Sequence, residues 1–90
     1  GGNTYDAALV SLEIARIYLE GGDTAAVKKI AKEMGAILEE GGIHHHAQEA
    51  LHLFQDAAER EAASLEFVVR LTVYLHRARR TPGLVFGRAA

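Results

Sequence analysis

Residues 8–38, ALVSLEIARIYLEGGDTAAVKKIAKEMGAIL, decide the fold, because two helical patterns meet there at a short break. Apolar residues on both sides of the break recur every three or four positions, which is the spacing of one face of an α-helix. The break, residues 21–24, begins with two glycines that can end a helix, and Asp23 or Thr24 can then cap the next one. The stretch therefore predicts two antiparallel helices joined by a tight turn.

The first of these helices, over about residues 5–20, carries more apolar surface than one buried face requires. Asn3 or Thr4 is its expected N-cap. A surface helix of a globular protein usually buries a single apolar stripe, and this one has two. The stripes are Leu9, Leu12, Ala15 and Leu19 on one side and Val10, Ile14 and Ile17 on the other. We therefore expect the helix to be covered on two sides or to meet a partner, and the predicted partner-binding residues are Val10, Ile14 and Ile17.

The second helix spans about residues 24–40 and is ordinarily amphipathic, with charged residues opposite its apolar stripe. Two glycines at residues 41–42 end it and complete the first hairpin. Its expected inward residues are Val27, Ile30, Met34, Ile37 and Leu38.

Residues 44–80 contain no glycine or proline, yet a single helix of that length would be about 55 Å long. A chain of 90 residues cannot bury such a helix. We therefore expect a break near residues 61–64, with Ser64 as the cap of the following helix. This gives a third helix over about residues 44–60 and a fourth over about residues 63–79. The expected inward residues are Ala47, Ala50, Leu51, Phe54, Ala57 and Ala58 in the third helix and Leu65, Val68, Leu71, Leu75 and Ala78 in the fourth.

The predicted fold is thus all-α, with about four helices forming two antiparallel hairpins. Residues 1–80 make up the helical domain. Residues 81–90 form a C-terminal tail, because Thr81-Pro82-Gly83 stops the fourth helix. The apolar trio Leu84-Val85-Phe86 is expected either to dock on the helices or to stay free.

Composition narrows the class of protein. Ninety residues allow one domain, and the absence of cysteine excludes disulfides and thiolate metal sites. No apolar run approaches the roughly 18–20 residues that a membrane-spanning helix needs, and the first residues lack the features of a secretory signal. We therefore expect a cytoplasmic protein with no membrane partner. Because the chain begins with Gly1 rather than Met, we also expect a processed product or a piece of a longer protein.

Charge is unevenly distributed along the chain. Residues 1–66 contain all twelve acidic residues and five basic ones, whereas residues 67–90 contain five arginines and no acid. Arginines near the end of a helix complement its dipole, and this is the interpretation we favour. The alternative is a nucleic-acid-binding helical domain that uses the arginine-rich fourth helix. The arginines concerned are Arg70, Arg77, Arg79, Arg80 and Arg88.

A cluster of histidines is the one feature that suggests a metal site. His45, Glu49 and His52 stand at i, i+4 and i+7, so they share a face of the third predicted helix. Two imidazoles and a carboxylate can bind zinc or a similar metal. The spacing differs from that of the HExxH motif, and histidine-rich helices also present such triplets by chance. We expect solvated histidines and no metal, and keep these three residues as candidates for metal-dependent assembly.

The sequence carries no catalytic motif. The two glycine pairs follow helices, where they act as C-caps, so they do not predict a phosphate-binding loop. Neither the order nor the spacing of the Ser, His and Asp residues suggests a nucleophilic triad. We therefore predict a protein that is not an enzyme and that needs no cofactor.

Residues 8–38 also resemble a tetratricopeptide repeat. That motif has small residues where its paired helices touch, an aromatic residue late in the first helix, and a Gly-Asp turn. Two features depart from it, because Val27 replaces the usual alanine and Gly41-Gly42 replaces the usual proline. The residues that fall at the positions of the motif, in its order, are Leu12, Ala15, Tyr18, Gly22, Asp23, Val27, Ala31 and Met34.

A second, weaker copy of the pattern lies 35 residues further along and lacks the aromatic residue and the Gly-Asp turn. Its residues are Ala50, Leu53, Ala57, Ala62 and Val69. Residues 5–80 are also similar to the helical C-terminal segment of larger bacterial tetratricopeptide-type proteins, whose opening is like YDAALVSL. The resemblance implies a stack of helix pairs that binds a protein or peptide, within a longer repeat array or as a homo-oligomer. The leading prediction is therefore a protein–protein interaction module or a self-assembling helical repeat unit.

Overall fold

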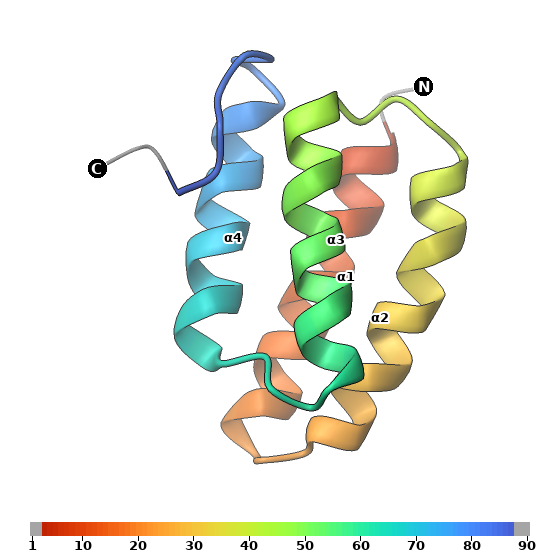
Figure 1. Ribbon diagram of the computed structural model, residues 1–90, viewed down its shortest axis with the longest axis vertical. Helices are drawn as coiled ribbons and strands as arrows, with labels where there is room; N and C mark the ends of the chain where they lie inside the picture. Colours follow the sequence, from red (N-terminus) through yellow and green to blue (C-terminus); the bar gives the residue numbers. More distant parts are fainter. Residues whose placement is uncertain (1–2, 88–90) are drawn as a thin grey trace.

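The computed structural model describes residues 3–87, which form four α-helices that run alternately in opposite directions (Figure 1). The predicted all-α fold of two antiparallel hairpins is confirmed. Every helix begins and ends within two residues of its predicted bounds. The helices are α1 (Asn3–Glu20), α2 (Thr24–Glu39), α3 (His45–Glu59) and α4 (Leu65–Ala78).

The four helices close into a ring in which each packs against two neighbours. α1 contacts α2 and α4, and α3 contacts the same two helices, so α1 lies behind α3 in Figure 1. At the α1–α4 contact, Arg79 Nη1 pairs with Asp6 Oδ1 at 2.9 Å, and the guanidinium lies over the ring of Tyr5. The packing of α1 against α4 closes the bundle, whereas the family resemblance implies an open stack of helix pairs. The resemblance itself stays a prediction.

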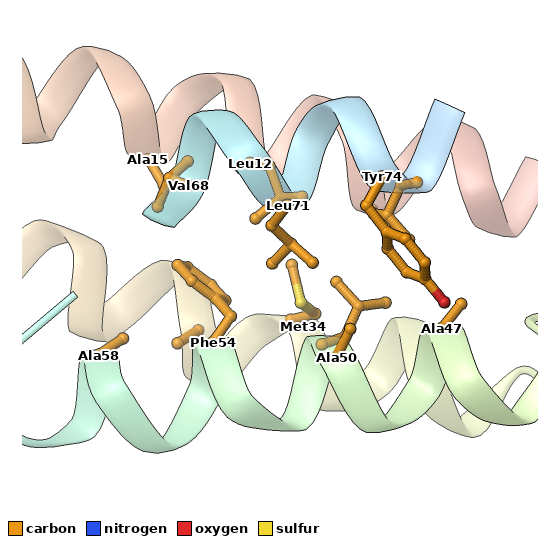
Figure 2. Packing of buried hydrophobic residues seen from close by; sticks show 14 of the residues in the cluster. Leu12, Ala15, Met34, Ala47, Ala50, Phe54, Ala58, Val68, Leu71 and Tyr74 are labelled. Atoms are coloured by element: carbon orange, nitrogen blue, oxygen red, sulfur yellow. The ribbon is translucent and has the colours of Figure 1, made fainter. Parts of the chain in front are cut away.

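The core lies at the centre of this ring and draws on all four helices. Leu12, Met34, Phe54 and Leu71, one from each helix, are fully buried and lie around a common centre (Figure 2). The other predicted inward residues of α2 and α3 are buried or partly buried. Small side chains let the helix backbones approach one another closely, so that four helices pack around one small core. The fully or nearly fully buried alanines of α1 and α3 are Ala8, Ala15, Ala47, Ala50 and Ala58.

Two of the predicted helix caps are present in the structure. Asp23 Oδ1 accepts a hydrogen bond from the backbone N–H of Ala26 at 3.0 Å, which settles the choice between Asp23 and Thr24. Ser64 Oγ accepts one from the backbone N–H of Phe67 at 3.1 Å, so the predicted break before α4 is confirmed. Each cap satisfies a helix donor that would otherwise lack a partner, and is worth about 1 kcal/mol.

The N-cap predicted for α1 is wrong, because α1 already includes both Asn3 and Thr4. Packing explains why the helix begins two residues earlier than predicted. Thr4 is buried, and the hydroxyl of Tyr5 accepts a hydrogen bond from the backbone N–H of His44 at 3.0 Å. This bond ties the first turn of α1 to the start of α3.

The two turns at the other end of the bundle are also tied together. Glu61 adopts a left-handed backbone conformation, with φ of 52°, where the chain leaves α3. Its Oε1 accepts a hydrogen bond from Thr24 Oγ1 at 2.7 Å. The α1–α2 turn and the α3–α4 connection therefore hold each other at the lower end of the bundle in Figure 1.

The predicted inward face of α4 is correct except at Leu65. Val68, Leu71, Leu75 and Ala78 are buried, but Leu65 is 39% exposed. Leu65 opens the helix and stands four residues before Val69, so it shares the outer face of α4 rather than the inner one. The sequence pattern alone did not separate these two faces.

Leu84 and Phe86 of the C-terminal tail dock on the bundle, which is the first of the two outcomes expected for the apolar trio at residues 84–86. Leu84 and Phe86 pack against the core, and the Phe86 ring meets Phe67 and Tyr74 in edge-to-face contacts. The hydroxyl of Tyr74 donates a hydrogen bond to the carbonyl oxygen of Leu84 at 2.8 Å. One buried phenol thus fixes the path of the chain after α4.

Candidate interaction surface

Three apolar side chains on α1 face solvent, and we call them the α1 outer face: Val10, Ile14 and Ile17. They are 58%, 43% and 55% exposed, at the i, i+4 and i+7 spacing of one helical stripe. Tyr18, also exposed, extends the stripe toward the end of the helix. The structure therefore confirms that this face is exposed, while its role in partner binding stays a prediction.

The α1 outer face is open because the bundle uses only the other stripe of the helix. Ala8, Leu12 and Ala15 are fully buried, and the contacts with α2 and α4 are made from that side. Among residues 3–87 nothing buries the second stripe. Of the two expectations for α1, coverage on both sides is therefore not met within the described chain.

A line of charged residues accompanies the stripe along α1. Arg16 pairs with Glu13 and, at 2.8 Å between Nη1 and Oε2, with Glu20. Its hydrogen bond to Glu13 lowers the pKa of that carboxyl group and raises the pKa of the guanidinium. The three side chains satisfy one another at the surface, so the charges near the outer face are already partnered.

A second exposed apolar set lies on α4, and its residues were not identified from the sequence. Leu65, Val69 and Val73 follow one another at intervals of four residues, and all three are exposed. The spacing of these residues along one helix face was the signal in the sequence that could have identified them. The outer faces of α1 and α4 thus both carry apolar side chains.

The histidine candidates do not converge on a metal site. His45 Nε2 lies 3.4 Å from Glu49 Oε2, whereas His52 Nδ1 lies 2.9 Å from Gln55 Oε1. His46 Nδ1 approaches the other oxygen of Glu49 at 3.3 Å. Within residues 3–87, no group of three or more His, Asp or Glu side chains is placed to hold a metal ion.

The basic end of α4 is only partly available for binding. His76, Arg77, Arg79, Arg80 and Thr81 surround a shallow hollow of about 590 Å³ at the end of the helix. Arg79 is engaged with Asp6, so this arginine helps to close the bundle. Arg88 lies outside the described residues.

Tyr74 makes the stability of the tail depend on pH. Burial raises the pKa of its hydroxyl, so the folded chain holds this proton more tightly than the unfolded chain does. The associated stability is complete below the ordinary tyrosine pKa of about 10 and falls as the pH rises above it. We expect the free energy of unfolding in urea to drop above about pH 10 and Tyr74→Phe to reduce that drop.

The hydrogen bond to Leu84 adds a second readout to the same experiment. Its loss in Tyr74→Phe should cost about 1 kcal/mol at neutral pH. Tyr18→Phe is the matched control, because Tyr18 is exposed and makes no side-chain hydrogen bond within residues 3–87. If the two variants had equal pH profiles, the assignment of this pH dependence to Tyr74 would be wrong.

Comparisons with known protein families, curated proteins and solved structures found no relative of this chain. No family model matches this chain, and neither the curated proteins nor the solved structures contain a significant match. In the described part of the chain, no helix combines the length and the apolar character needed to cross a membrane.

Proposed function

We propose that this chain is a non-catalytic protein-interaction module whose α1 outer face binds a helix of another protein chain. The observation that carries the proposal is the exposure of Val10, Ile14 and Ile17 on a helix whose other stripe already fills the core. A bundle that only needed to fold would gain nothing from three large apolar side chains in solvent. A helix laid along the stripe would remove them from water.

A second copy of the chain is the partner that we propose first. A twofold pairing needs only one self-complementary patch, and a straight stripe on one helix can cover the same stripe on its copy. In the neighbouring line, Arg16 is already ion-paired with Glu13 and Glu20 within the chain, so the line opposes the approach of a second copy only weakly.

The size of the stripe limits the strength of this association. In a twofold dimer three such side chains from each chain become buried, and burying the exposed half of each of these six contributes about 1 kcal/mol. Association costs at least about 4 kcal/mol in lost translational and rotational freedom. Tyr18 and the surrounding surface must therefore contribute, and we expect a dissociation constant of about 10 µM to 1 mM rather than a permanent dimer.

Sedimentation across that concentration range tests the proposal. The expected result is an average mass that rises from one chain toward two as the concentration increases. Because the charges near the face are already paired, added salt should change the constant little. A mass of one chain at every concentration up to about 1 mM would contradict self-association.

Nucleic-acid binding through the basic end is the second candidate, and the hollow lined by Arg77 and Arg80 favours it. Phosphate contacts would make the affinity for single-stranded RNA fall steeply with salt. A titration with a labelled oligonucleotide at low salt decides this. No binding there would exclude the candidate.

A further inference from the structure

We propose that the hollow between α4 and the C-terminal tail binds a small amphipathic carboxylate, meaning an acid whose apolar part is a short chain or a single ring. The hollow has a volume of about 230 Å³ and is open to solvent on one side. It is separate from the α1 outer face and does not depend on the function proposed above. Its lining consists of Val69, Arg70, Val73, Tyr74, Arg77, Leu84, Phe86 and Gly87.

The walls of the hollow are apolar and held in place. Val69 and Val73 supply one wall from the outer face of α4, and Leu84 and Phe86 supply the other from the tail. The bond from Tyr74 to the carbonyl of Leu84 fixes the second wall. A site with preformed walls loses little freedom when a ligand enters it.

The volume sets the size of the ligand. An apolar cavity of about 150 Å³ is large enough for benzene, and pockets for drug-sized molecules begin near about 300 Å³. A hollow of 230 Å³ therefore suits one ring or a chain of a few carbons. It is too small for a nucleotide or a folded peptide segment.

The rim of the hollow carries the charge that selects the ligand. Arg70 and Arg77 stand two turns apart on α4, and the Arg70 guanidinium lies 5.5 Å above the Phe86 ring. Neither arginine forms an ion pair within residues 3–87, and the sequence has no acid between residues 67 and 90. Guanidinium groups recognise carboxylates through paired hydrogen bonds. Apolar walls beneath two arginines that form no ion pair within residues 3–87 match a molecule with an apolar body and one carboxylate.

Titration of isotope-labelled protein with 4-phenylbutyrate, followed by amide NMR, tests this site. We expect the shifted amides to cluster at residues 69–77 and 84–87. The dissociation constant should be about 1 mM, as expected for a ligand of about a dozen non-hydrogen atoms. The neutral analogue 4-phenylbutanamide should bind about tenfold more weakly, because it cannot form the charge-assisted bonds.

Two variants separate the charge of the rim from the shape of the hollow. Arg77→Gln should weaken 4-phenylbutyrate about tenfold and leave the amide analogue unchanged. Val73→Trp should weaken both ligands, because the indole fills the hollow, and Val73 is exposed enough for the bundle to accept it. The control is Arg60→Gln, since Arg60 is an exposed arginine at the end of α3 that does not line the hollow.

Three results would overturn the site. These are shifts spread over the whole chain, equal binding of the acid and the amide, or unchanged binding in Val73→Trp. None of them bears on association through the α1 outer face, because the variants and the shifted amides lie on α4 and the tail.

Discussion

Replacing Leu51 by alanine is expected to lower the free energy of unfolding by about 3 kcal/mol or more. Leu51 is fully buried on the inner face of α3, so truncation removes apolar contacts and leaves a cavity. A small domain has few kilocalories of stability in total, and this loss should lower its melting temperature by well over about 10 °C. Urea unfolding followed by circular dichroism measures the change.

The same substitution two residues further along α3 provides the control. Leu53 is 53% exposed, so Leu53→Ala loses few contacts and should cost no more than about 1 kcal/mol. Both variants replace leucine by alanine in α3, so the difference between their losses in free energy of unfolding reports the burial of the side chain. Equal losses at residues 51 and 53 would mean that α3 is rotated from the position described.

The second large effect concerns association through the α1 outer face. The double change Ile14→Glu/Ile17→Glu places two carboxylates where the proposed interface excludes water, and neither would have a partner. We expect the dissociation constant to rise by at least about 100-fold, to the point where only single chains sediment. The free energy of unfolding of the single chain should change by less than about 1 kcal/mol, because both positions face solvent.

Val69→Glu/Val73→Glu is the matched control, since it adds the same charges to the exposed apolar set of α4. Association should survive it. If this control abolished association and the α1 variant did not, the interface would lie on α4. A loss of helicity in the α1 variant would instead show that Ile14 and Ile17 belong to the core.

Local signals explain why the helices were predictable from the sequence. Asp23 and Ser64 each follow a helix-ending segment and cap the next helix, so their effect needs no knowledge of the rest of the fold. The break before α4 was the least obvious, because no glycine or proline marks it. Glu61 takes up the left-handed conformation that a glycine usually provides.

Contacts between distant residues could not be predicted in the same way. The pairing of Asp6 with Arg79 closes the ring, yet nothing near either residue in the sequence indicates the other. The docking of Phe86 onto α4 could not be predicted either, because the helical periodicity of the sequence ends before Pro82. Leu65 is exposed because α4 packs inward through the face of Val68, Leu71 and Leu75.

The candidate sites likewise include features that the local sequence predicts and features that it does not. The second apolar stripe of α1 could be recognised from the sequence, but whether another helix covers it could not; the structure shows that it is exposed. The metal candidates could not be judged from spacing, since residues seven apart lie about 10.5 Å from each other along a helix. His45 does reach Glu49, but His52 turns to Gln55 instead.

The central claim, that two chains meet through the α1 outer face, is tested most directly by an isotope-filtered NMR experiment. Carbon-13-labelled and unlabelled chains are mixed at about 1 mM, the upper end of the expected dissociation constant. We predict magnetisation transfer between molecules from the methyl groups of Val10, Ile14 and Ile17. Transfer that arose only from Val69 and Val73, or none at all, would contradict the claim.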